Sequence, residues 1–261
     1  MVVKFLFQAI LITITAFIVT KSLKLKKYSL IYLCSLPFLI FYQDNIQILV
    51  FTLLFGTLLS LAVFRPSSFS PFLVFFSLLF FFIIFRPQLG IIDYPVALHF
   101  INQQRGEHLN LPLSALARLF HNKISLSYTL VKTFQEHLSP ITLFAQAKYK
   151  LFDSPYLLGQ LFPYDVVFLM LALQKTVNKR IKRRVNPSVF FIILFYVFAI
   201  LFFQNESTKY IFSHAIVYFL AVYIARYISK LTFPKPVFII ILNFIFLALH
   251  FFLDGNYIVI L

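Results

Sequence analysis

The residues best suited to chemistry lie in two polar clusters within an otherwise apolar chain. Residues 102–108 hold seven residues of little apolar content, and His121-Asn122-Lys123 follows at the expected start of a helix. Free backbone N–H groups at a helix start, together with a cation, favour an anion. We therefore expect Arg105, His121 and Lys123 to contact a phosphate or lipid pyrophosphate. Helix capping and a solvated loop are the competing interpretation.

Asp165 is the one carboxylate inside an expected membrane span, directly after Pro163-Tyr164. Ionisable groups inside a membrane are costly, so they are candidates for function. The alternative is an interfacial residue that reaches water, because Asp165 falls near the outer end of its span. The complete predicted binding set for a lipid phosphate is Arg105, Glu107, His121, Lys123, His137 and Asp165.

Motifs for several common chemistries are absent from the sequence. It contains no Walker loop, zincin helix, nucleophile elbow or kinase motif set. Four histidines of the polar region lack the spacing that would place two ligands on one helix face: His99, His108, His121 and His137. We expect no cofactor and no metal, although a zinc site assembled in three dimensions stays open. His214 and His250 are expected to be buried structural residues or hydrogen-bonding groups between helices.

The composition predicts that lipid is the solvent for much of the surface. Hydrophobic residues make up 61% of the 261 residues and charged residues 12%, with 37 Phe and no Trp. A soluble domain is nearer half apolar and a quarter charged. The net charge of +15 does not indicate nucleic acid, because the positive residues form short clusters between apolar runs. Tyr164 and other tyrosines at the ends of apolar runs are expected to act as interfacial anchors.

Eight apolar runs have lengths near those needed to cross a bilayer in helical form. The fold class predicted is therefore all-α, a polytopic transmembrane bundle of about eight spans, with short amphipathic helices on its extracytoplasmic face. The spans expected are Phe5–Thr20, Tyr28–Tyr42, Ile46–Phe64, Pro71–Phe85, Leu157–Leu173, Val189–Phe203, Tyr210–Ile228 and Val237–Leu253. The second and fourth are short, and either of them is open to a re-entrant interpretation.

Basic residues set the expected orientation. With the N-terminus outside, the cytoplasmic loops hold fourteen Lys and Arg, whereas the short outer segments hold only Lys4 and Lys209. This bias predicts a multi-pass protein of the cell membrane, with residues 86–156 extracytoplasmic. The basic loops serve orientation, and contact with anionic lipid head groups is the alternative.

The chain divides into three expected parts: a four-helix membrane half at 1–85, an extracytoplasmic helical segment at 86–156, and a second four-helix half at 157–261. Within the middle part, Leu126, Leu130, Phe134 and Leu138 recur every four residues and predict one apolar helix face. Short helices of this kind lie on a membrane surface or on the bundle.

Three runs of the outer segment carry a resemblance to a known family. They are Asn102-Gln103-Gln104-Arg105-Gly106-Glu107-His108, Leu119-Phe120-His121-Asn122-Lys123 and Gln135-Glu136-His137-Leu138-Ser139-Pro140. Together with Tyr156–Leu173 they resemble the outer loop and following helix of bacterial membrane glycosyltransferases of the GT-C superfamily, similar to the protein mannosyltransferases. The resemblance covers about a third of the chain.

This resemblance implies transfer of a sugar from a polyprenyl-phosphate-linked donor on the extracytoplasmic face. Members of the family are about twice this length, and their catalytic carboxylate lies in a large first outer loop. Here the corresponding loop is only Gln43-Asp44-Asn45. The resemblance therefore implies a truncated, degenerate or accessory member, working with a catalytic partner subunit, and it supplies no catalytic residue.

Two other functions compete with that expectation. A non-catalytic scaffold or assembly protein of the cell envelope would use the helices and outer segment only as contact surfaces. A small-solute transporter is the third possibility. Transporters commonly show internal repeats and interrupted helices near the membrane midplane, and neither is apparent in the sequence.

Overall fold

The structure is a computed structural model, and it describes part of the chain. The described residues are 2–40, 46–64, 78–79, 81–84, 103, 130–144, 160–178, 187–203, 206–232 and 234–258. Every element named in these ranges is an α-helix, which confirms the all-α prediction for this part of the chain. Most of the expected span at 71–85 lies outside the described residues, although 78–79 and 81–84 are helical.

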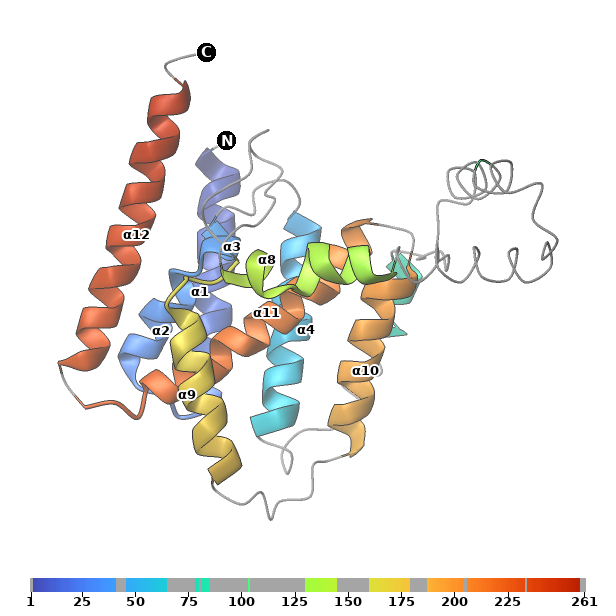
Figure 1. The fold of residues 1–261 in the computed structure, drawn as a ribbon, viewed down its shortest axis with the longest axis horizontal. Helices are drawn as coiled ribbons and strands as arrows, with labels where there is room; N and C mark the ends of the chain where they lie inside the picture. The colour runs from blue at the N-terminus through green and yellow to red at the C-terminus, as the bar shows by residue number, and fades with distance from the viewer. Residues whose placement is uncertain are drawn as a thin grey trace.

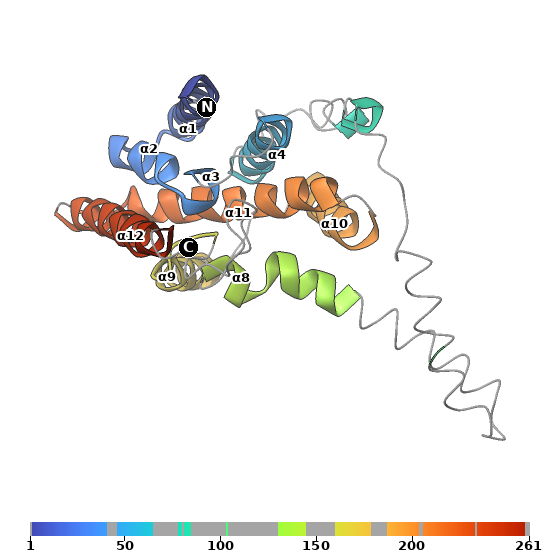
Figure 2. The same cartoon turned by 90° about the horizontal axis from the view of Figure 1, so that it is seen from above.

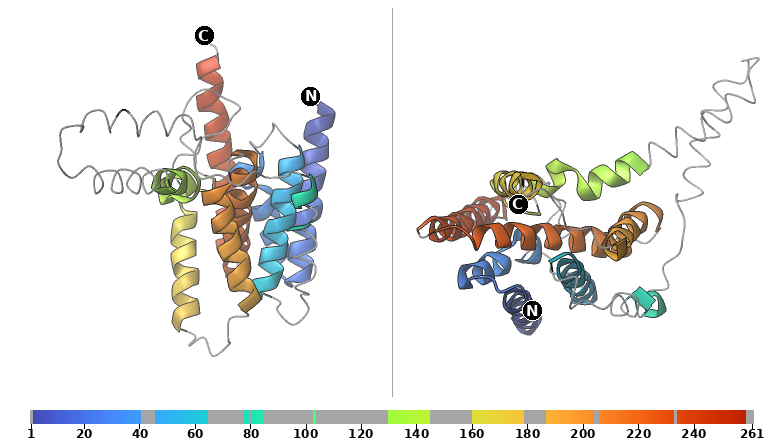
Figure 3. Two further views of the ribbon diagram at one scale, coloured as in Figure 1. Left: turned by 90° about the vertical axis from the view of Figure 1, so that its right-hand side faces the viewer. Right: turned by 90° about the horizontal axis from the view of Figure 1, so that it is seen from below.

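The long helices run roughly side by side and alternate in direction, and the two chain ends lie at the same end of the molecule (Figure 1). A short helix at 130–138 continues into α8 and lies across this arrangement (Figure 3). The elements are α1 Val2–Ser22, α2 Lys27–Cys34, α3 Pro37–Ile40, α4 Ile46–Phe64, α8 Pro140–Phe144, α9 Asp165–Asn178, α10 Pro187–Phe202, α11 Glu206–Ile228 and α12 Lys235–Ile258.

Helix α11 is the centre of the fold. It crosses the molecule obliquely, with α1, α2 and α4 on one side and α8 and α9 on the other (Figure 2). It packs against α4, α10, α9 and α2. Its buried side chains point in every direction around the helix, as expected for a helix surrounded by others. They include Phe212, Ala215, Tyr218, Ala221 and Ala225.

Aromatic rings join α4, α10 and α11. The ring of Phe55 stacks on Phe212 with 5.3 Å between centroids, and Phe81 meets Phe212 edge-on at 5.2 Å. Tyr196 donates its hydroxyl proton to the backbone oxygen of Phe55 at 3.1 Å. Edge-on and offset-stacked pairs are the favourable geometries for aromatic rings. In this region, phenylalanine rings therefore provide the packing between helices.

Gly56 permits the close approach of α4 and α11. A Cβ atom at this position would lie 2.8 Å from Tyr218 Cβ and 3.1 Å from the backbone oxygen of Ala215. Neither atom is the mobile end of a side chain, so the two helix backbones would have to separate. Small residues at such crossings allow helices to pack closely.

Two helices, Ile46–Phe64 and Thr208–Ile228, are long and apolar enough to cross a bilayer. Both are largely buried, as core helices of water-soluble proteins also are. The outer helices expose large apolar side chains. Phe7 and Phe17 of α1 are 51% and 54% exposed, and Phe238 of α12 is 64% exposed.

Two expected spans are not continuous helices. The run at 28–42 forms α2 and α3, which are separated by Ser35 and Leu36, and Pro37 begins the second helix. In the expected span at 157–173, the described residues 160–164 are not helical, and helix α9 begins at Asp165. A proline lacks the N–H needed inside a helix, and its ring clashes with the preceding turn. Pro37 and Pro163 account for the two interruptions.

Replacing Gly56 by alanine is expected to destabilise the fold by about 1–3 kcal/mol, the usual cost of overpacking a close contact. Thermal unfolding in detergent should show a lower midpoint for Gly56→Ala. Leu54→Ala is the matched control on the same helix, because Leu54 is 36% exposed and its truncation should change the midpoint little. An unchanged midpoint for Gly56→Ala would contradict the close α4–α11 crossing.

Candidate functional site

The two interrupted helices meet at a buried cluster of polar side chains. We call this cluster the polar junction and define it as Tyr32, Ser35, Tyr164, Asp165 and Asn243. Four of the five are fully or almost fully buried, and Tyr164 is partly buried. They come from α2 and its end, from the start of α9 and from α12, so the junction ties together segments distant in sequence.

The end of α2 places Ser35 in the junction. Its backbone N–H lies 3.1 Å from the carbonyl oxygens of both Ile31 and Tyr32, which closes the last turn of the helix. Its side-chain hydroxyl donates to the Tyr32 carbonyl oxygen at 2.9 Å. Ser35 therefore satisfies carbonyl groups that a continuing helix would have bonded.

The second interruption, residues 160–164, is buried although it is not helical. The backbone N–H groups of Gln160 and Leu161 donate to the carbonyl oxygens of Thr142 and Leu143, at 3.2 and 2.8 Å. Leu161 and Phe162 are 0% exposed. Buried backbone groups need such partners. The helix at 140–144 provides them, so it holds this segment in place.

Asn243 connects the two interruptions through α12. Its side-chain Nδ2 donates to the Ser35 hydroxyl oxygen at 2.7 Å, and its Oδ1 accepts the Tyr164 hydroxyl proton. Tyr164 also stacks on Phe162, with 5.3 Å between ring centroids. A single amide on α12 thus bonds the broken end of α2 and the residue before α9.

Asp165 closes a turn with Phe162 at the start of α9. Its Oδ2 accepts the Phe162 N–H at 3.0 Å, while its own N–H donates to the Phe162 carbonyl oxygen at 2.9 Å. The side-chain bond corresponds to the acidic half of a capping box. A carboxylate at a helix N-terminus also interacts favourably with the helix dipole. These bonds explain how a carboxylate remains at 0% exposure.

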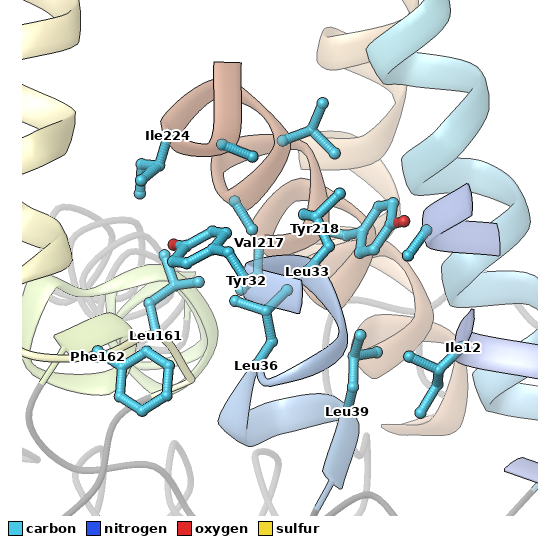
Figure 4. Packing of buried hydrophobic residues seen from close by; sticks show 14 of the residues in the cluster. Ile12, Tyr32, Leu33, Leu36, Leu39, Leu161, Phe162, Val217, Tyr218 and Ile224 are labelled. Carbon is cyan, nitrogen blue, oxygen red and sulfur yellow. The ribbon is translucent and has the colours of Figure 1, made fainter. Parts of the chain in front are cut away.

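The side chains of Asp165 and Tyr32 also interact, but neither Asp165 Oδ1 nor Tyr32 Oη completes a hydrogen bond of regular geometry. Tyr32 points from α2 towards Leu161 and Phe162, away from Tyr218 (Figure 4). The junction therefore contains a carboxylate oxygen and a phenol whose bonding capacity is not fully used. The chemistry open to this pair is hydrogen bonding to a hydroxyl or amide group and exchange of a proton.

A second polar cluster lies near the start of α11. The ring of His137 meets Tyr210 edge-on at 4.9 Å between centroids, and Tyr210 stacks on His214 at 5.6 Å. His137 and His214 are 2% and 3% exposed. The burial of His214 agrees with its expected structural role. The described residues contain no group of three or more His, Cys, Asp or Glu able to hold a metal ion.

The expected apolar face of the helix at 130–138 is only partly buried: Leu130 and Leu138 are half-buried, and Leu138 packs against the core. Thr133 and His137 turn inward, whereas Phe134 is 45% exposed and Val131 is 54% exposed. Apolar residues recur at helical spacing along this helix, but its most buried residues are the polar Thr133 and His137. A polar group turned inward can meet polar partners on neighbouring helices, such as Tyr210.

Only two of the six predicted binding residues fall in the described ranges, and they occupy different clusters. Asp165 belongs to the polar junction, and His137 packs on Tyr210. Four others lie outside the described residues: Arg105, Glu107, His121 and Lys123. Tyr32, Ser35 and Asn243 are not among the site residues predicted from the sequence. Two features of the sequence could have indicated them: Pro37 interrupts a short apolar run, and Asn243 is an amide within the last expected span.

Family models, curated proteins and solved structures were compared with the chain, and none of them matches it.

Ser35 and Tyr164 should be energetically coupled, because both bond Asn243. Ser35→Ala and Tyr164→Phe should each destabilise the protein, and the double variant should deviate from additivity by about 0.6 kcal/mol, the average for hydrogen bonds between membrane helices. Unfolding in a denaturing detergent measures the cycle.

Tyr223→Phe is the control for this cycle. The Tyr223 hydroxyl donates to the Ala172 carbonyl oxygen at 3.0 Å, which is outside the junction. Its effect should add to that of Ser35→Ala. Strict additivity between Ser35→Ala and Tyr164→Phe would mean that Asn243 does not link the two interruptions.

Proposed function

We propose that the chain is a multi-pass membrane protein of about eight spans with its N-terminus outside the cell. The exposed apolar side chains of the outer helices support this, because such a surface needs a lipid solvent. On α1, α9, α10 and α12 they include Phe7, Phe17, Met170, Phe198, Phe238 and Phe244. The basic residues at the α1–α2 and α11–α12 connections agree with a cytoplasmic location for these loops.

The buried interruptions agree with a membrane setting. Non-helical backbone at membrane depth is tolerated only where protein encloses it or where it lines a water-filled cavity. Both interruptions are enclosed, and side chains or neighbouring carbonyl groups bond several of their backbone groups. These two described interruptions therefore suit a bilayer, because they are enclosed by protein.

Cysteine labelling tests the orientation. In a Cys34→Ala background, an impermeant thiol reagent should label Gln135→Cys in intact cells and should label Thr232→Cys only after permeabilisation. Both positions are exposed in the protein. Labelling of Thr232→Cys in intact cells, with Gln135→Cys protected, would reverse the proposed sides.

For the activity, we infer a role in lipid-linked glycosyl transfer, as a truncated, degenerate or accessory member of a GT-C-like system. The resemblance of residues 102–108, 119–123 and 135–140 supports this, together with one structural observation. The helix at 140–144, which lies in the same expected outer segment directly after the last of these runs, bonds the backbone at residues 160–161, near Asp165. A movement of the outer segment would therefore shift the backbone beside the buried Asp165–Tyr32 pair.

In this proposal the outer segment contacts the polyprenyl-phosphate part of a donor or acceptor, and a catalytic partner subunit performs the transfer. Asp165 is a positioning residue, because its carboxylate bonds the Phe162 N–H just before α9 and interacts with Tyr32. The second candidate is a non-catalytic envelope scaffold. The observation in its favour is that the bonds of Ser35 and Asn243, and one oxygen of Asp165, are already used in holding helices together.

Loss of Arg105 and Lys123 together should weaken polyprenyl-phosphate binding by at least about a hundredfold. Each charge-assisted bond to a phosphate is worth about 1.5–3 kcal/mol, and about 1.4 kcal/mol corresponds to tenfold in affinity. Native mass spectrometry of the Arg105→Ala, Lys123→Ala double variant measures this. The matched control is Lys132→Ala with Lys209→Ala, which removes equal charge elsewhere on the proposed outer side. Equal affinity of the double variant and the wild type would favour the scaffold.

A further inference from the structure

Two loops that are about two hundred residues apart lie side by side at one end of the helices. One connects α1 to α2, and the other connects α11 to α12. The Tyr28 hydroxyl donates to the Leu231 carbonyl oxygen at 3.5 Å, and the Ser29 hydroxyl donates to the Ala225 carbonyl oxygen at 3.1 Å. The side chains of Leu23, Leu25 and Leu231 pack against the same apolar core. The two loops therefore form one continuous surface.

This surface is strongly positive. Its exposed lysines are Lys21, Lys24, Lys26, Lys27, Lys230 and Lys235. Residues 1–43 and 207–253, which include both loops and the helices that flank them, contain no Asp or Glu at all. Positive charges on a protein surface are normally interspersed with acids, because like charges repel one another. Nothing in these two segments supplies such a counter-charge.

Three of these lysines, Lys26, Lys27 and Lys235, stand at helix starts, where the helix dipole disfavours a cation. Helix α2 begins at Lys27, its N-cap residue Lys26 makes no side-chain capping bond, and its first turn has no acidic residue. Helix α12 begins at Lys235, again with no acid in its first turn. The N-terminal end of a helix carries partial positive charge, which favours an anion. In α12 the N–H groups of Lys235 and Val237 already donate to the carbonyl oxygens of Thr232 and Pro234, so only the dipole acts there. Here two neighbouring helix starts carry cations instead.

The α1–α2 loop has a fixed shape. Lys24 has a φ of 54°, in the left-handed region that a residue with a side chain rarely adopts. The turn is closed by a bond from the Leu25 N–H to the Thr20 carbonyl oxygen at 2.9 Å. This is the usual way to end a helix, but glycine is the usual residue at such a position. The chain has a lysine there, which places another cation on the surface.

We propose that the two loops together bind the phosphate head group of an anionic phospholipid in the cytoplasmic leaflet. This site rests on the membrane orientation proposed above. The anion supplies negative charge to a surface whose two flanking segments contain no acidic residue. Clusters of about four to eight Lys or Arg directly beside membrane helices on this side of a membrane are suited to such head groups.

The test uses the full chain in a zwitterionic detergent, titrated with phosphatidylglycerol or phosphatidylcholine and followed by native mass spectrometry. The test variant is Lys24→Gln, Lys27→Gln, Lys230→Gln. The control is Lys179→Gln, Arg180→Gln, Lys182→Gln, which removes the same charge from another loop of the same expected side. The wild type and the control should prefer phosphatidylglycerol. The test variant should bind it at least about tenfold more weakly.

Thermal unfolding distinguishes loss of the lipid site from a folding defect of the test variant. Without added lipid, the test variant should unfold at a midpoint close to that of the wild type. All three side chains are exposed, and the relief of repulsion at Lys27 offsets the loss of Lys24 and Lys230 from helix ends. Phosphatidylglycerol should then raise the unfolding midpoint of the wild type and the control more than that of the test variant. Equal loss of lipid binding in both triple variants, or no preference for phosphatidylglycerol in the wild type, would overturn the site.

Carbonate extraction of cell membranes separates this inference from the proposed membrane architecture. If the wild type is released by carbonate, the membrane proposal fails and the lipid site fails with it. If the protein stays in the membrane while the test variant still binds phosphatidylglycerol as tightly as the wild type, only the lipid site is overturned.

Discussion

The fold depends on how two interruptions in its helices satisfy their backbone groups. A broken helix leaves N–H and C=O groups without intrahelical partners, and burial makes each unbonded group costly. At the end of α2, the Ser35 hydroxyl bonds the Tyr32 carbonyl oxygen, and just before α9, the Asp165 carboxylate accepts the Phe162 N–H. The carbonyl oxygens of Thr142 and Leu143 accept the N–H groups of residues 160–161. The buried polar side chains are thus a consequence of where the chain stops being helical. The same requirement brings a carboxylate next to the Tyr32 phenol.

Helix α11 provides the surface on which these interruptions rest. It touches α4 closely at Gly56 and holds α2 through the bond from Ser29 to Ala225. Its two ends carry different features. The start packs on the helix at 130–138 through Tyr210 and His137, and the end leads into the lysine-rich loops. One buried helix therefore connects the expected outer segment with the proposed lipid site.

The sequence predicted the helical class and most helix positions well, because long apolar runs leave few alternatives to a helix. Ile46–Phe64 was predicted with the bounds that the structure has, and α10, α11 and α12 differ from prediction by a few residues. Asp165 was recognised because a carboxylate in an apolar run is conspicuous. Its partners were not, since Tyr32, Ser35 and Asn243 are ordinary residues until the tertiary fold brings them together. The interruptions were also missed, although Pro37 and Pro163 marked both positions.

Hydrogen–deuterium exchange across residues 160–165 tests the central claim most directly. The account predicts slow exchange of the Leu161 and Phe162 amides, comparable with that of α11, because both are buried and bonded although they lie outside a helix. Asp165→Leu should speed exchange at Phe162, whose acceptor is lost, while Leu161 stays protected by Leu143. Fast exchange of both amides in the wild type, as in a solvent-exposed loop, would contradict the enclosed polar junction.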